Sequence, residues 1–149
     1  EVPGGVVDVV LEEPVAALEK LCRFTFEHHR RNPAFVRMVM TENIHHGRHI
    51  RVSEAIRDVN RPAIEIMRRI LKRGQDAGLF RPGLDALELH WQISALSFYN
   101  VSNTETFSFN FGNTLFSEAG QEALSAHVAE MLLRYVLRPE HITRIGKGD

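Results

Sequence analysis

The chain has 149 residues, of which 44% are hydrophobic and 25% charged, and a formal net charge of −1, as expected for one ordinary globular domain. No apolar run approaches the roughly 20 residues of a membrane-spanning helix, and no signal peptide is visible. The single cysteine, Cys22, excludes an internal disulfide and favours a reducing compartment, so we expect a cytoplasmic protein with no membrane partner.

The net charge hides an asymmetry along the chain. Residues 20–81 contain 14 Lys and Arg against six Asp and Glu, whereas the remainder contains four against 13. Solvated helix faces explain such a pattern without any partner. The alternative is that the basic half lies near an anion, such as DNA held by a neighbouring domain, although the chain contains no nucleic-acid-binding motif.

Helical signals begin after residues 1–13, which we interpret as a lead-in or linker. Pro14 suits the first turn of a helix over residues 14–31, whose apolar side chains share one broad arc. Asn32 precedes a proline and ends this helix. A second helix is predicted over residues 34–46, and we expect it to be largely buried because apolar residues surround most of it.

Two further helices are separated by the break Asn60-Arg61-Pro62. The first, over residues 48–59, is shorter and more polar. The second, over residues 62–77, has one apolar stripe and a basic back. Gly78 is expected to end it, because glycine readily adopts the left-handed conformation that closes helices.

The next helix begins at Asp85, which forms a capping-box pattern with Glu88. It is apolar on two opposed faces, so one face can meet the core and the other a second subunit. We expect Trp91 and Phe98 to face inward, and the pattern leaves open which of the two faces meets the second subunit. The first face comprises Leu87, Trp91, Ala95 and Phe98, and the second comprises Ala86, Leu89, Ile93 and Leu96.

The last part of the chain begins with a polar and aromatic stretch, residues 101–116, which predicts a kinked extension of the preceding helix or a short strand. Ser117 is expected to cap a final helix to about Leu137, with a wide apolar arc. Residues 140–149 are interpreted as a mobile tail. The chain as a whole predicts an all-α bundle of about six helices, with one domain over residues 14–139.

No motif for enzyme chemistry is present: there is no phosphate loop, GxGxxG, GxSxG, HExxH or CxxC. Cys22 lies on an apolar helical face, where a thiol is usually an inert small hydrophobe. We therefore expect neither an enzyme nor a cofactor.

A metal site is the less favoured interpretation of a small His cluster. Glu42, His45 or His46, and His49 would share a helical face and are competent zinc ligands. They do so only if the helix continues through Gly47, and glycine argues against that continuity.

The pattern Gly-x-x-x-Gly-x-Phe-Arg from Gly74 to Arg81, followed by the helix capped by Asp85, resembles a segment of tetracycline-repressor-like (TetR family) regulators. Residues 24–35, together with the later Glu42, resemble the central helices of that family. Residues 91–99 resemble the helix that precedes its final one. The resemblance covers roughly residues 14–139.

This resemblance implies the ligand-binding and dimerisation domain of a one-component bacterial transcriptional repressor. The last two long helices of each subunit would pair into a four-helix bundle in a homodimer. DNA would be bound only by an N-terminal helix-turn-helix domain, which we expect to be missing, because the 13 residues before Pro14 cannot hold it. The expected dimer contacts are Leu89, Ile93, Leu96, Leu124, Val128, Met131, Leu132 and Tyr135.

A small hydrophobic or aromatic effector would bind between the central helices and change the affinity for DNA. The candidate binding residues combine apolar and aromatic side chains with a few polar ones, as in most small-molecule sites. They are Phe26, His29, Met38, Glu42, Asn43, Met67, Ile70, Trp91, Ser94, Phe98, Asn103 and Phe107. The competing hypothesis is a helical small-molecule carrier or protein-interaction module without a link to DNA.

Overall fold

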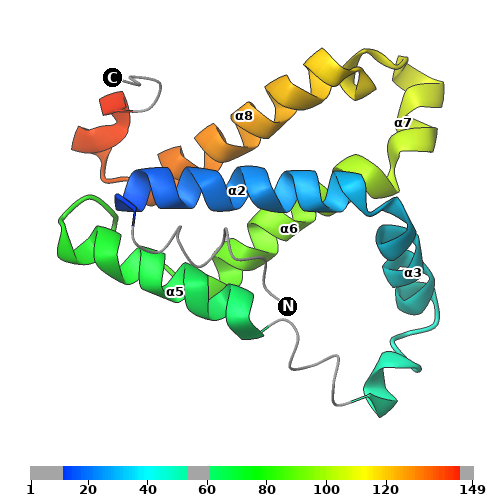
Figure 1. Cartoon of the computed structure of the whole chain (residues 1–149), viewed down its shortest axis with the longest axis horizontal. Coiled ribbons are helices and arrows are strands. Elements are labelled where there is room, and N and C mark those ends of the chain that lie inside the picture. Colours follow the sequence, from blue (N-terminus) through cyan, green and yellow to red (C-terminus); the bar gives the residue numbers. More distant parts are fainter. Residues whose placement is uncertain (1–11, 54–60, 145–149) are drawn as a thin grey trace.

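The computed structural model describes residues 12–53 and 61–144, and it confirms the predicted all-α class (Figure 1). None of the described helices is both long enough and apolar enough to cross a membrane. The longer helices are α2 (Pro14–Arg31), α3 (Pro33–Ile44), α5 (Arg61–Asp76), α6 (Ala86–Ser102), α7 (Thr104–Phe111) and α8 (Glu118–Val136). The short 3-10 helices are η1 (Ile50–Val52), η2 (Thr114–Phe116) and η3 (Pro139–Arg144).

Helix α2 lies at the centre of the bundle, with α5, α6 and α8 packed around it (Figure 1). Its apolar face is buried, as the periodicity predicted, and Leu18 and Phe26 are at most 2% exposed. Complete burial of such a side chain contributes about 2 kcal/mol. Cys22 belongs to the same face, and burial raises the pKa of its thiol to about 12, which keeps it protonated and unreactive.

The helix boundaries follow the local signals in the sequence. The Glu88 N–H donates to Asp85 Oδ1 at 2.8 Å, and the Gly120 N–H donates to Ser117 Oγ at 3.0 Å, so both predicted caps are confirmed. Gly78 has a φ of +70° just after α5, as a helix-ending glycine should.

Helix α3 is far more exposed than predicted. Val36 is its only buried residue, whereas Met38 is 60% exposed and Ile44 is 72% exposed. The reason is that α3 projects from the end of α2 (Figure 1) and packs mainly on α6. Its remaining apolar side chains therefore face solvent, and the prediction of a largely buried helix is wrong.

The segment after α3 is a turn where a helix was predicted to begin. His46 and Gly47 have φ values of 57° and 70°, and in the described stretch up to residue 53 only the 3-10 turn η1 follows. The rest of the predicted helix over 48–59, residues 54–59, lies outside the described residues, as does most of the predicted linker over 1–13.

The C-terminal third of the chain has the predicted kinked helical extension, but its predicted mobile tail is partly ordered. Helix α7 follows α6 after a break at Asn103, so the stretch is a kinked helical extension and the strand alternative is wrong. The predicted tail begins as the ordered turn η3, from which Ile142 packs against the core. Residues 145–149 lie outside the described residues.

The connection between α5 and α6 is fastened to the bundle by Phe80. Its side chain is completely buried, and it forms an isolated antiparallel bridge with Leu137. The Phe80 ring lies directly on Gly74, where an added Cβ would stand 2.0 Å from Cδ2 of that ring. The Gly-x-x-x-Gly-x-Phe-Arg pattern is therefore a packing motif.

Two main-chain hydrogen bonds complete this fastening. The Arg81 N–H donates to the Val136 carbonyl at 2.9 Å, and the Arg138 N–H donates to the Leu79 carbonyl at 2.9 Å. Together they hold the end of α8 against the connection that leads into α6.

Replacing Gly74 by Ala should lower the free energy of unfolding by about 2 kcal/mol or more, because the new methyl group displaces Phe80 from a packed core. Urea unfolding followed by circular dichroism measures the change. Gly78→Ala is the matched control: its Cβ meets nothing within 4 Å, so it costs only the left-handed backbone strain, about 1 kcal/mol. Equal losses in the two variants would contradict the role given to Phe80.

Candidate functional site

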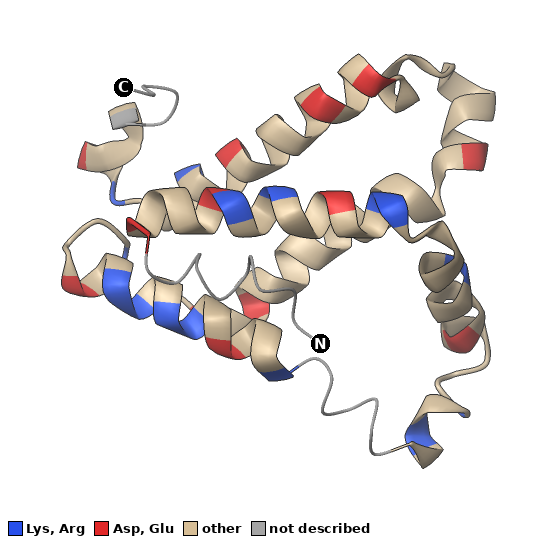
Figure 2. Cartoon of the chain, in the orientation of Figure 1, with Lys and Arg blue, Asp and Glu red and all other residues tan. Residues whose placement is uncertain are grey.

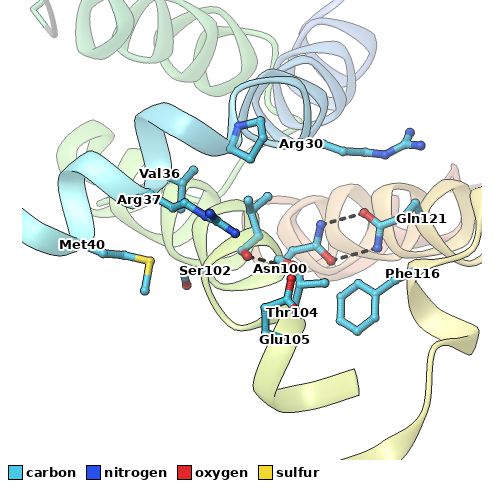
Figure 3. Close-up of a pocket in the computed structure, with 12 residues that line it drawn as sticks. Arg30, Val36, Arg37, Met40, Asn100, Ser102, Thr104, Glu105, Phe116 and Gln121 are labelled. Carbon is cyan, nitrogen blue, oxygen red and sulfur yellow. Dashed lines mark hydrogen bonds between the residues drawn. The ribbon is translucent and has the colours of Figure 1, made fainter. Parts of the chain in front are cut away.

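A pocket of about 510 Å³ lies where the ends of α2 and α6 meet α3, α7 and α8 (Figure 3). This volume is within the range of about 300–1,000 Å³ that is typical of small-molecule sites. Its wall combines apolar side chains with hydrogen-bonding and charged ones. It is lined by Arg30, Pro33, Val36, Arg37, Met40, Asn100, Val101, Ser102, Thr104, Glu105, Phe116 and Gln121.

A reciprocal amide pair joins α6 to α8 at one wall of this pocket (Figure 3). Asn100 Nδ2 donates to Gln121 Oε1 at 2.8 Å, and Gln121 Nε2 donates to Asn100 Oδ1 at 3.0 Å. Gln121 Nε2 also donates to the Leu115 carbonyl at 2.9 Å, and this carbonyl fixes the orientation of both amides. Gln121 thus uses both its N–H groups, whereas one N–H of Asn100 has no partner among the described residues.

The two arginines of the pocket differ in their surroundings. Arg30 donates hydrogen bonds to Glu118 and to Glu27, with 3.2 Å between its Nη1 and Glu27 Oε2, and the bond that it donates to Glu118 is the main cause of its raised pKa. Arg37 forms no side-chain hydrogen bond or ion pair with any residue in the described ranges, and it lines the same pocket as Asn100 (Figure 3). Glu105 on the same wall has no such partner within those ranges either. The pocket therefore contains one guanidinium whose hydrogen-bonding capacity is unused.

A half-buried aromatic cluster lies between α2 and α6. The rings of His29 and Phe98 meet edge to face with centroids 6.3 Å apart, and His29 Nδ1 donates to the Thr25 carbonyl at 2.8 Å. The donating Nδ1 leaves Nε2 as the acceptor of a neutral ring. Burial lowers the pKa of His29. The pKa of His90 is also lowered, mainly by burial and to a smaller extent by the charge of the nearby His29.

The candidate metal ligands instead stabilise the turn after α3. Glu42 Oε1 accepts hydrogen bonds from the N–H groups of His49 at 2.7 Å and Ile50 at 3.0 Å, and Oε2 lies 3.0 Å from His49 Nδ1. The bond from Ile50 is the main reason that the pKa of Glu42 is lowered. Within residues 12–53 and 61–144, no three His, Cys, Asp or Glu side chains are grouped to hold a metal ion.

The twelve residues predicted to bind a ligand do not line this pocket. Met67 and Ile70 are completely buried in the packed core, as Phe26 nearly is. Trp91 is 69% exposed, so the prediction that it faces inward is wrong. The others are partly or largely exposed elsewhere: His29, Met38, Glu42, Asn43, Ser94, Phe98, Asn103 and Phe107.

Sequence reasoning missed Arg37, Asn100 and Gln121 as a group. Asn100 carried a usable signal, because it is a polar residue within an otherwise apolar helix and needs a partner there. Arg37 and Gln121 had no such signal, since each resembles an ordinary polar residue of a solvated helix face.

The two apolar faces of α6, between which the sequence did not choose the one that meets a partner, differ in their environments. Leu89 and Ile93 are at most 2% exposed, whereas Leu87 is 63% and Trp91 is 69% exposed. The reason is that α2 and α5 both pack on the face that contains Leu89 and Ile93. This face is therefore occupied by the core of the same chain, and the Trp91 face is open.

The residues predicted on α8 divide in the same way. Val128 and Leu132 are buried in the core, whereas Met131 is 57% and Tyr135 is 40% exposed. Leu96 and Leu124 are partly buried against the core. An open apolar strip thus remains on each of the last two long helices.

Comparison with known proteins gives one family and one curated relative. The family described as the tetracyclin repressor-like C-terminal domain matches residues 14–132. The HTH-type transcriptional repressor NicS of Pseudomonas putida is 30% identical over 128 residues, which are 86% of this chain and 60% of that repressor. The chain therefore spans about 60% of the length of this relative.

Stability should fall as the pH is lowered below the ordinary histidine value of 6.5, because His29 and His90 have lowered pKa values in the folded chain. Between the lowered and the ordinary pKa, the unfolded chain binds more protons than the folded one, so acid favours unfolding. Urea unfolding at several pH values should show a smaller slope for the His29→Gln/His90→Gln variant. Identical slopes in the wild-type chain and in this double variant would refute the assignment.

Proposed function

The chain belongs to the tetracyclin repressor-like C-terminal domain family of transcriptional regulators, and from this we propose that it is the dimerisation and effector-sensing domain of a one-component repressor. It acts by a binding equilibrium in the cytoplasm and catalyses no reaction. The observation that carries the proposal, beside family membership, is the open apolar strip on α6 and α8.

The dimer contact is assigned to the exposed strip and not to the buried one. Leu87, Trp91 and Tyr99 on α6 are each at least 57% exposed, and Met131 on α8 is 57% exposed. Large apolar side chains gathered on an otherwise polar surface mark an interaction site. Homodimers are typical of this family, and a two-fold axis would let the same strip cover itself in a four-helix bundle.

DNA binding is assigned to a helix-turn-helix segment outside these 149 residues. The HTH-type repressor NicS is longer than the region matched here, since the chain covers 60% of it. The basic side of α5 does not require DNA (Figure 2). Arg68 and Arg69 pair with Glu65, and Lys72 pairs with Asp76, so this surface is explained as a solvated helix face.

The effector site is assigned to the pocket at the ends of α2 and α6. The pair Asn100 and Gln121 supports this assignment, because it joins the two helices that form the dimer contact. A ligand that binds beside this pair and favours one spacing of α6 and α8 would shift the dimer between two arrangements. The coupling to DNA follows if these arrangements differ in operator affinity.

Trp91→Glu should convert the dimer into a folded monomer, because it places a charge in the proposed contact without touching the core. Sedimentation velocity at micromolar concentration measures the change, and circular dichroism checks the fold. Ile44→Glu is the matched control, since Ile44 is 72% exposed on α3 and should leave the dimer intact.

Leu89→Glu tests the opposite, buried face of α6. Leu89 is 1% exposed, so this charge should unfold the chain, with no folded monomer formed. A wild-type chain that sediments as a monomer, or a Trp91→Glu variant that remains dimeric, would remove the proposed contact.

The nucleotide sequence of the gene tests the proposed link to DNA binding. The reading frame that encodes this chain should contain, before Glu1, a segment with a helix-turn-helix pattern. The full-length product should then retard a DNA fragment from its own promoter in a gel-shift assay. A start codon directly before Glu1 would favour the carrier or interaction-module alternative.

A further inference from the structure

We propose that the pocket at the ends of α2 and α6 binds a small organic carboxylate, whose acid group pairs with Arg37 and whose apolar body packs on Met40 and Phe116. The inference rests on the proposed function, because it names the chemical class of the effector for the same pocket.

The charge of the pocket is the first argument. Arg37 has no side-chain partner among the residues of the described ranges, whereas the guanidinium of Arg30 is engaged by Glu27 and Glu118. A guanidinium presents parallel N–H donors that match the two oxygens of a carboxylate, and such charge-assisted pairs are about twice as strong as neutral hydrogen bonds. A neutral hydrocarbon would leave these donors unused.

The second argument is a fixed donor on the wall of the same pocket (Figure 3). Asn100 keeps one N–H without a partner in the described part of the chain, and its orientation is set by Gln121 and the Leu115 carbonyl. A side chain held in this way loses little conformational freedom when a ligand binds. Asn100 can therefore donate a second hydrogen bond to an oxygen of the ligand.

The third argument is the apolar part of the pocket lining, which selects the rest of the ligand. Met40 and Phe116 are only partly buried, so both offer an apolar surface to a ligand in the same pocket. Glu105 also lines it and lowers its net positive charge. A single carboxylate on an apolar body suits this combination, whereas a small multiply charged anion such as phosphate has nothing to place on the apolar wall.

Isothermal titration of the 149-residue chain tests the proposal with benzoate, phenylacetate and hexanoate, each beside its neutral amide. At least one acid should bind, and its amide should bind about tenfold more weakly, the loss of roughly one charge-assisted hydrogen bond. Arg37→Gln should weaken binding of the acid about tenfold but leave the amide unchanged. Glu105→Gln should strengthen binding of the acid, because it removes a repelling charge.

Arg51→Gln, which replaces another exposed arginine outside the pocket, serves as the control and should change neither affinity. Equal binding of acids and amides, insensitivity to Arg37→Gln, or no binding of any acid at millimolar concentration would overturn the proposal. Sedimentation of the same samples reports separately on the dimer. A dimer that binds none of these acids therefore refutes the ligand class and leaves the proposed function standing.

Discussion

The contact between Phe80 and Gly74 is the constraint on which the arrangement of the helices depends. Glycine lets the ring lie directly on the backbone of α5, where a Cβ would stand 2.0 Å away. The main-chain bonds of Arg81 and Arg138 then tie this connection to the end of α8. Helices α5, α6 and α8 are thereby fixed around α2, and α6 has little freedom to rotate about its own axis.

The fixed rotation of α6 determines both surfaces to which function is assigned. It turns Leu89 and Ile93 toward α2 and α5, which leaves Trp91 in solvent. It also turns Asn100 toward α8, where the reciprocal bonds with Gln121 form one wall of the pocket. The pocket and the exposed strip thus share the same two helices, so a ligand in one can affect the geometry of the other.

The sequence was informative wherever a local signal decides the structure. Caps such as Asp85 and Ser117, and the glycine after α5, gave helix limits correct to within about one residue, because each signal acts within one turn of helix. The orientation of α6 could not be obtained in this way, since both of its faces are apolar and periodicity does not identify the neighbour of each. Periodicity also does not show which helices pack on α3, so its apolar side chains were predicted to be buried. Arg37 was not predicted as a pocket residue, because a pocket formed by five helices has no local pattern in the sequence.

The central claim is that the Trp91 face of α6 meets a second copy of the chain, and Trp91 itself reports on it because it is the only tryptophan among the 149 residues. The measurement is acrylamide quenching of tryptophan fluorescence over a range of protein concentrations. At concentrations where the chain is a dimer, we expect weak quenching, and on dilution to monomers the quenching should rise toward that of an indole 69% exposed to solvent. Strong quenching that does not change with concentration, while sedimentation shows a dimer, would contradict the account.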